Sequence, residues 1–142
     1  MYKILITDTI SDNGLKILED DKIEVIYKPK INQEKLEAML PNINGWIIRS
    51  GTQITEKHLA EAKKLSVIGR AGVGVDNINI QAATAAGIVV MNLPDGNTIS
   101  AAEHTMSLLS ALSRNVHIGH LGLMRGEWNR DKLVGNELKD KI

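Results

Sequence analysis

The chain has 142 residues, and its 17 Lys and Arg residues balance 17 Asp and Glu residues, so the formal net charge is zero. This balance argues against nucleic-acid and anionic-membrane partners, and an aromatic content of 3% with no Phe argues against base stacking. Because there is no cysteine, no signal-peptide run and no apolar run near the roughly 20 residues of a membrane span, we expect a cytoplasmic protein without thiolate metal sites.

Five short runs rich in Ile and Val recur about every 20 to 22 residues, which is the length of one strand and one helix with their connections. The helical patterns between them begin at the capping residues Ser11, Asn32, Thr55 and Asn79. This alternation predicts an α/β fold, namely a flavodoxin-like open parallel five-stranded sheet with helices on both faces. The predicted strands span residues 3–7, 23–27, 45–49, 66–70 and 87–91.

A long amphipathic segment follows the predicted sheet. Ser100 and Glu103 have the spacing of a capping box, and apolar residues then recur at helical intervals. We expect one helix from Ser100 to about Arg125, with Gly119 and Gly122 as possible bends. The sequence therefore predicts a sheet domain over residues 1–98 and a linking segment over residues 99–142.

Chemistry-bearing residues follow the third and fourth predicted strands. Arg49 and Ser50 end the third strand, and Arg70 with a glycine-rich loop ends the fourth. Ligands of open parallel sheets bind outside the carboxyl ends of the strands, and glycines let backbone N–H groups approach an anion. We therefore predict a small-anion site here, although a glycine turn without a ligand remains the alternative.

Three other functions are disfavoured by particular residues. The glycine loop begins like the dinucleotide motif Gly-x-Gly-x-x-Gly, but Asn77 stands at the third glycine position, so we do not expect a pyrophosphate loop. A phosphoacceptor receiver needs a carboxylate where Arg49 stands. His117 and His120 have a chelating spacing without a nearby third ligand, so no metal site is predicted. We assign no catalysis to His58, which we expect to be partly solvated.

Four motifs stand in a characteristic order and spacing, namely Arg49-Ser-Gly-Thr and the segments 69–77, 91–98 and 100–103. Together they resemble the N-terminal part of the D-isomer-specific 2-hydroxyacid dehydrogenases. The resemblance covers essentially the whole chain, and residues 135–142 resemble the lead-in to that family's nucleotide-binding strand. It implies an NAD-dependent oxidoreductase, and the members most resembled oxidise 3-phosphoglycerate to 3-phosphohydroxypyruvate in serine biosynthesis.

The resemblance assigns roles to residues at the predicted anion site. It implies that Arg49 and Ser50 face the anionic groups of a small 2-hydroxy acid. It also implies that the backbone amides of Ala71, Gly72 and Val73 hold the substrate carboxylate, and that Val73 lies against the nicotinamide cofactor. A guanidinium fork and convergent N–H donors suit such an anion on chemical grounds as well.

Other implications concern parts outside the predicted sheet. Asn97 matches an asparagine that borders the substrate, and Arg130 matches a basic position that reaches the phosphate in a neighbouring subunit, which implies a homodimer or a higher oligomer. The family's catalytic residues have no counterpart here, and NAD would be bound mainly by a nucleotide-binding domain that these residues do not include. We therefore expect an inactive fragment of the enzyme. A glycerate- or glyoxylate-type relative and a non-catalytic anion-binding or dimerisation module remain alternatives.

Overall fold

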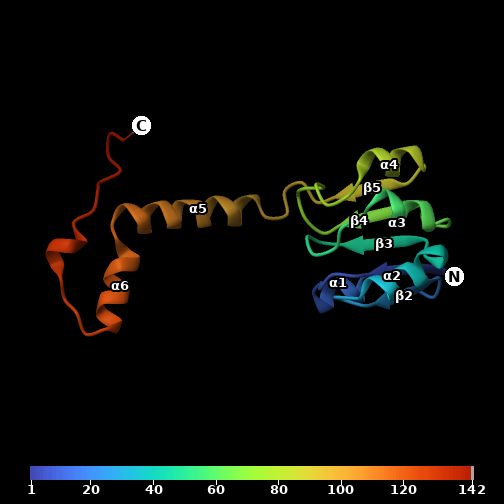
Figure 1. The fold of residues 1–142 in the computed structure, drawn as a ribbon, viewed down its shortest axis with the longest axis horizontal. Helices are drawn as coiled ribbons and strands as arrows, with labels where there is room; N and C mark the ends of the chain where they lie inside the picture. Colours follow the sequence, from blue (N-terminus) through green and yellow to red (C-terminus); the bar gives the residue numbers. More distant parts are fainter. Residues whose placement is uncertain (142) are drawn as a thin grey trace. The chain divides into compact units, whose positions relative to one another are not determined.

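The computed structural model describes residues 1–141. It divides into two units, of which the first spans Met1–Gly96 and the second begins at Asn97 (Figure 1). We call the first the sheet unit and the second the helical unit, and describe each by itself. The functional division predicted at residues 98 and 99 stays a prediction.

The sheet unit contains five parallel strands in the order β2-β1-β3-β4-β5. This is the predicted flavodoxin-like arrangement, and each strand begins and ends within two residues of its predicted bounds. The strands all point in the same direction, so their carboxyl ends share one edge of the sheet (Figure 1). They are β1 (Tyr2–Ile6), β2 (Ile23–Tyr27), β3 (Gly45–Ile48), β4 (Val67–Arg70) and β5 (Val89–Asn92).

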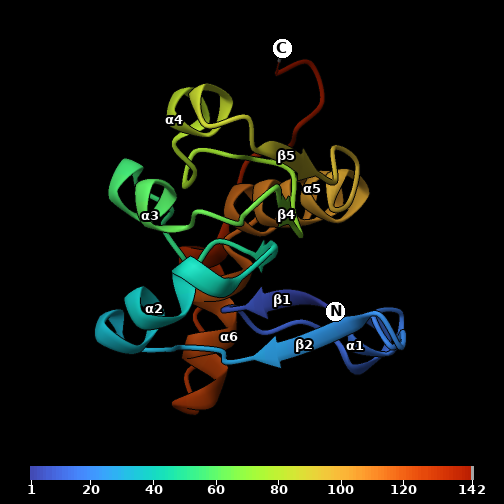
Figure 2. The same cartoon turned by 90° about the vertical axis from the view of Figure 1, so that its right-hand side faces the viewer.

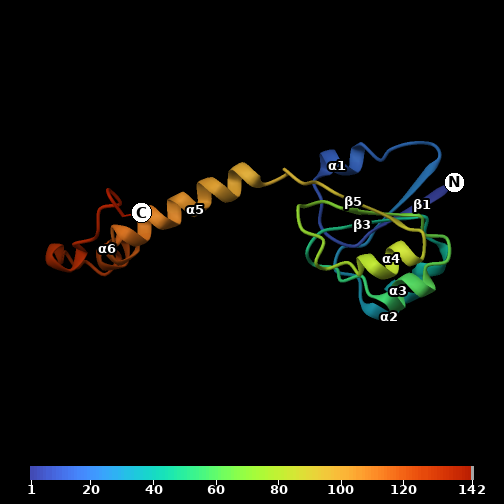
Figure 3. The same cartoon turned by 90° about the horizontal axis from the view of Figure 1, so that it is seen from above.

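Helices lie on both faces of this sheet, as predicted. Figures 2 and 3 show α1 on one face and α2, α3 and α4 on the other. Each of the four predicted capping residues accepts a hydrogen bond from an amide of the first turn of its helix. The helices are α1 (Asp12–Lys16), α2 (Gln33–Met39), α3 (Glu56–Glu61) and α4 (Ile80–Ala85), and a short 3-10 helix, η1 (Leu40–Asn42), follows α2.

The hydrophobic core lies between the sheet and helices α2, α3 and α4. Leu5, Trp46 and Ile68 stand in register on three adjacent strands and are fully buried. Burying a large apolar side chain stabilises a fold by roughly 1.5–3 kcal/mol. The indole N–H of Trp46 donates to the hydroxyl oxygen of Thr7 at 3.0 Å, so the core satisfies its buried donor at the carboxyl end of β1.

The helical unit differs from the single helix that we predicted. It contains α5 (Thr98–Ser113), α6 (Val116–Met124) and a 3-10 helix, η2 (Arg130–Leu133). The break falls at Asn115, which has a left-handed φ of 52°, and not at a glycine. The prediction of a capping box at Ser100 is also wrong, because α5 begins at Thr98 and its first residues make no side-chain cap.

No helix among residues 1–141 combines the length and the apolar character that crossing a membrane requires.

Candidate functional site

Arg49 and Ser50 follow the last residue of β3 and are both exposed at the carboxyl edge of the sheet. One guanidinium nitrogen of Arg49, Nη1, lies 3.4 Å from the carbonyl oxygen of Thr9, which is a long hydrogen bond. Among the described residues the Arg49 side chain makes no ion pair. The charge of Arg49 is therefore available to a ligand, and its predicted contact with a substrate stays a prediction.

The backbone of the loop from Arg49 to Thr52 is held by two side chains from other parts of the chain. The carboxylate of Asp8 accepts the N–H groups of Arg49 and Thr52, at 2.7 and 3.1 Å. The side-chain amide of Asn77 donates to the carbonyl oxygens of the same two residues, at 2.7 and 2.6 Å. Sequence patterns gave no signal for these contacts, because they join residues far apart along the chain.

The glycine loop follows β4 and lies beside the Arg49 loop, since β3 and β4 are neighbours in the sheet. Not all of the amides of this loop are free to bind a ligand. The N–H of Ala71 donates to the carbonyl of Ile48 at 2.8 Å, and the N–H of Gly72 donates to the carbonyl of Arg70 at 2.8 Å. The amide of Val73 has no acceptor within residues 1–141, and this residue is 38% exposed. Of the three amides predicted to hold a carboxylate, only that of Val73 is therefore free without rearrangement.

Arg70 is a further candidate site residue. Its position at this edge was predicted from the sequence, but no role was predicted for it. It is the last residue of β4 and is half-buried. Its guanidinium group occupies the space beside Gly72 that a side chain there would need. Its Nε atom is buried, and no described residue accepts from it. A buried guanidinium nitrogen without an acceptor is a position at which an anion would be stabilised. We call Arg49, Ser50 and residues 70–74 the anion rim.

Asn97 and Arg130, the other two predicted site residues, belong to the helical unit. Asn97 precedes α5 without a side-chain capping bond, and Arg130 is exposed at the start of η2. Their predicted contacts with a substrate stay predictions.

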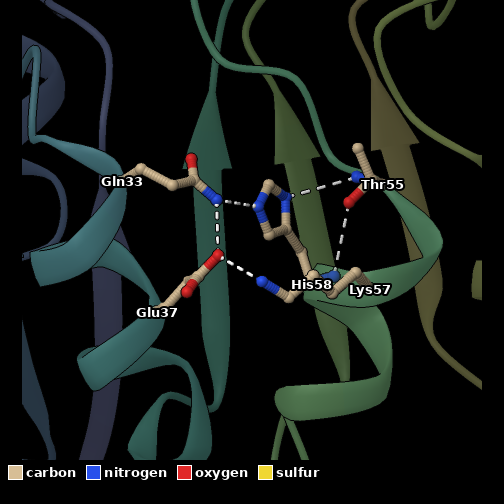
Figure 4. Close-up of polar contacts among 5 residues, drawn as sticks. All are labelled: Gln33, Glu37, Thr55, Lys57 and His58. Atoms are coloured by element: carbon tan, nitrogen blue, oxygen red, sulfur yellow. Dashed lines mark hydrogen bonds and ion pairs between the residues drawn. The ribbon is translucent and has the colours of Figure 1, made fainter.

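A cavity of about 610 Å³ lies beside the rim in the sheet unit. It lies between the end of β1 and helices α2 and α3. Its walls include Thr52 of the Arg49 loop and Asp8, which bonds that loop. Figure 4 shows that side chains of α2 and α3 meet in this region. The cavity thus shares a wall with the loop that carries Arg49.

His58 is buried beside this cavity, with 6% of its surface exposed, so our expectation of a partly solvated side chain was wrong. Its Nδ1 accepts the N–H of Thr55 at 3.3 Å, while its Nε2 lies 2.8 Å from the side-chain nitrogen of Gln33 (Figure 4). The ring also meets Trp46 edge-to-face, with centroids 6.0 Å apart. The motif Thr55-x-x-His58 was a signal for the capping box that the imidazole completes, but it did not indicate that the side chain is buried.

Glu37 of α2 and Lys57 of α3 form an ion pair of 2.7 Å (Figure 4). The hydrogen bond from Lys57, followed by one from Gln33, lowers the pKa of Glu37, and Glu37 in turn raises the pKa of Lys57. These groups are therefore bonded to one another, and the cluster of Figure 4 helps to join α2 to α3.

The glycine loop does not have the geometry of a dinucleotide site. In that motif a helix begins directly after the glycines, so that its N-terminus meets the pyrophosphate. Here Asp76 and Asn77 form a turn, as expected, and α4 begins only at Ile80. The residues of this loop therefore do not fit the pyrophosphate of a dinucleotide cofactor.

Comparisons with known proteins agree with this arrangement. Residues 4–128 match the model of the family described as D-isomer specific 2-hydroxyacid dehydrogenase, catalytic domain. The chain is 41% identical over its whole length to D-3-phosphoglycerate dehydrogenase of Sus scrofa, and 45% identical over 99% of its length to the protein of that name from Methanocaldococcus jannaschii. It spans 27% of the length of each of these relatives.

The fold is also found among solved structures. The structure of 3-phosphoglycerate dehydrogenase of Entamoeba histolytica with bound NAD⁺ aligns with a TM-score of 0.76 and 29% identity, over 98% of this chain and 44% of that one. Because the family model covers most of the sequence and the sheet order is the predicted one, the chain belongs to the D-isomer-specific 2-hydroxyacid dehydrogenase family.

Proposed function

We propose that this chain is the substrate-binding part of an NAD-dependent D-3-phosphoglycerate dehydrogenase, which oxidises 3-phosphoglycerate to 3-phosphohydroxypyruvate. The observation that carries the proposal is the anion rim. Arg49, which makes no ion pair among the described residues, follows β3, and the free amide of Val73 follows the neighbouring strand β4. The names of the relatives support the choice of substrate.

The residues of the rim suit different parts of a phosphorylated hydroxy acid. Arg49 offers a planar fork of N–H donors to an oxyanion, and Val73 adds a backbone donor from the neighbouring strand end. Arg70 brings a second guanidinium to the same edge, with its Nε still without an acceptor among the described residues. Donors from two adjacent strand ends would hold the substrate in one orientation. Such positioning lowers the barrier of the reaction.

NAD, when bound, would supply the hydride acceptor for this oxidation. Since the glycine loop does not fit a pyrophosphate, we propose that the described residues touch the cofactor at most through Val73, and that NAD is held mainly by residues outside this chain. The family resemblance likewise implies that the proton-abstracting group lies outside it.

The proposal is tested by titrating the isotopically labelled chain with 3-phosphoglycerate and following its ¹H–¹⁵N spectrum. We expect saturable shifts of the Ser50 and Val73 amides, and loss of these shifts in the variant Arg49→Ala. Titration with glycerate tests the alternative of a glycerate-type enzyme, because glycerate lacks the phosphate. Equal or tighter binding of glycerate would remove the phosphate assignment, and absence of any shift with either acid would contradict the proposed function.

We also propose that the helical unit packs against a second copy of the chain. Apolar side chains along α5 and α6 stay exposed in the single chain, and an array of this kind on two consecutive helices is typical of an interface. Sedimentation of the chain at two concentrations tests this association. The exposed residues include Met106 (57%), Leu112 (63%), Val116 (57%), Leu121 (52%) and Met124 (74%).

A further inference from the structure

The four backbone groups at the two ends of the Arg49 loop are all bonded to side chains. Asp8 takes both N–H groups, and Asn77 bonds both carbonyl oxygens, so that Arg49 and Thr52 are each held from two sides. A short exposed loop usually satisfies such groups with water and stays mobile. This one is attached to the end of β1 through Asp8 and to the glycine loop through Asn77.

The packing around Asp8 shows that the loop is shaped to receive this carboxylate. One oxygen of Asp8, Oδ2, accepts both amides. The other, Oδ1, occupies the space in which a Cβ atom at Gly51 would lie. A side chain at position 51 would therefore displace the carboxylate, and the absence of one lets Asp8 reach the loop.

The orientation of the Asn77 amide is fixed by its partners. Two carbonyl oxygens face one of its terminal atoms, so that atom must be the nitrogen, which has two protons to donate. The oxygen, Oδ1, is then left buried without a partner among residues 1–141. An unpaired buried acceptor costs free energy. The two hydrogen bonds that the nitrogen donates therefore fix the side chain in this orientation, although its oxygen is left without a partner.

We propose that Asp8 and Asn77 are positioning residues that fix the Arg49 loop and thereby set the affinity of the anion rim. This inference rests on the proposed function. Asn77 also ties the two halves of the rim together, because it follows the glycine loop and bonds the loop after β3. Neither residue needs to touch the substrate for its replacement to weaken binding.

The experiment compares affinities for 3-phosphoglycerate across variants, using the same labelled chain and spectrum. Asp8→Ala and Asn77→Ala are expected to bind about tenfold more weakly than the unmodified chain, because each loses two hydrogen bonds that fix the loop. Asp8→Asn places an oxygen where Oδ2 accepts both amides, and should bind within about threefold of the unmodified chain. Asn77→Asp instead sets an acceptor against two carbonyl oxygens, and should bind at least as weakly as Asn77→Ala.

Asp20→Ala is the matched control, because Asp20 also accepts a backbone amide, that of Lys22 at 2.7 Å, but in an exposed turn before β2. It should leave the affinity unchanged. A role confined to stability would leave both isosteric variants, when folded, with the affinity of the unmodified chain, whereas the proposal requires that the affinity survive in Asp8→Asn and fall in Asn77→Asp.

Two results separate the possible failures. If the unmodified chain binds and the Asp8 and Asn77 variants bind equally well, the positioning role is wrong and the proposed function stands. If the unmodified chain itself shows no shift, the proposed function fails and the positioning role falls with it. Should Asp8→Ala not fold, the contrast between Asp8→Asn and Asn77→Asp alone decides, since equal affinities would overturn the inference.

Discussion

The guanidinium group of Arg70 fills the space that a side chain at position 72 would need, so Gly72 and Arg70 are packed as a pair. Replacing Gly72 with Ala therefore forces the Arg70 side chain out of this position. We expect Gly72→Ala to weaken binding of 3-phosphoglycerate, measured by the amide shifts of Ser50 and Val73. Gly69→Ala is the control, because its Cβ would lie 3.8 Å from the Ile47 side chain, an ordinary contact. Equal affinities of the two variants would contradict a role for the Arg70 placement.

Arg49→Ala should remove a hydrogen-bonding charge from the anion rim. We expect a loss of roughly 1.5–3 kcal/mol in binding free energy for 3-phosphoglycerate, the usual contribution of a hydrogen bond to a charged group. Arg49→Lys keeps the charge but not the planar fork, and should lie between the two. Calorimetric titration measures all three proteins. An unchanged affinity in Arg49→Ala would show that this arginine has no part in binding.

Thr7→Val should destabilise the core by about 1–3 kcal/mol, because it leaves the buried indole N–H of Trp46 without an acceptor. Urea unfolding followed by Trp fluorescence gives the free energy of unfolding. Thr84→Val is a suitable comparison, since the Thr84 hydroxyl donates to a helix carbonyl at an exposed position. A Thr7→Val protein as stable as the Thr84→Val protein would argue against this buried bond.

The ion pair between Glu37 and Lys57 should make a stability difference that depends on pH. The pKa of Glu37 is lowered in the folded protein, so its contribution is present above the unfolded value, about 4.3, and is lost as the pH falls through the lower folded value. The pKa of Lys57 is raised, so its contribution is lost as the pH rises past about 10.4.

We therefore expect Glu37→Gln to lower the melting temperature at pH 7, and the difference from the unmodified protein to shrink below pH 4. Glu19→Gln serves as the reference, because Glu19 is exposed and makes no ion pair within residues 1–141. A difference between Glu37→Gln and the unmodified protein that persists unchanged at pH 3 would show that it does not come from the charged pair.

The 142-residue chain should not reduce NAD by itself. It contains no Gly-x-Gly-x-x-Gly segment, and its glycine loop has no helix N-terminus for a pyrophosphate. Incubation with 3-phosphoglycerate and NAD, with absorbance read at the NADH maximum, checks this. Accumulation of NADH at an enzyme-like rate would mean that the chain carries its own hydride chemistry.

The sheet could be predicted from the sequence because its signals are local. Runs of Ile and Val with regular spacing located each strand to within two residues, and the capping residues located the starts of α1 to α4. Arg49 could be placed for the same reason, since the end of a parallel strand fixes the edge on which its next residue lies.

The remaining errors come from interactions that no local pattern encodes. Asn115 takes a left-handed conformation while its side chain donates to the carbonyl of Val134, 19 residues later, and this divides the predicted helix. The burial of His58 depends on Trp46 and Gln33, which lie on other elements. The amides of Ala71 and Gly72 were predicted to hold a carboxylate, and no local pattern showed that each already donates to a carbonyl of the strand ends.

The way the Arg49 loop is attached has a practical meaning for redesign. Its outer residues, Arg49 and Thr52, are fixed through the main chain, whereas Ser50 is exposed and its side chain makes no hydrogen bond with residues 1–141. Position 50 can thus be varied without disturbing the contacts that hold the loop. New side chains at position 50 can be screened for altered acid preference, provided that Gly51 is retained to leave room for the Asp8 carboxylate.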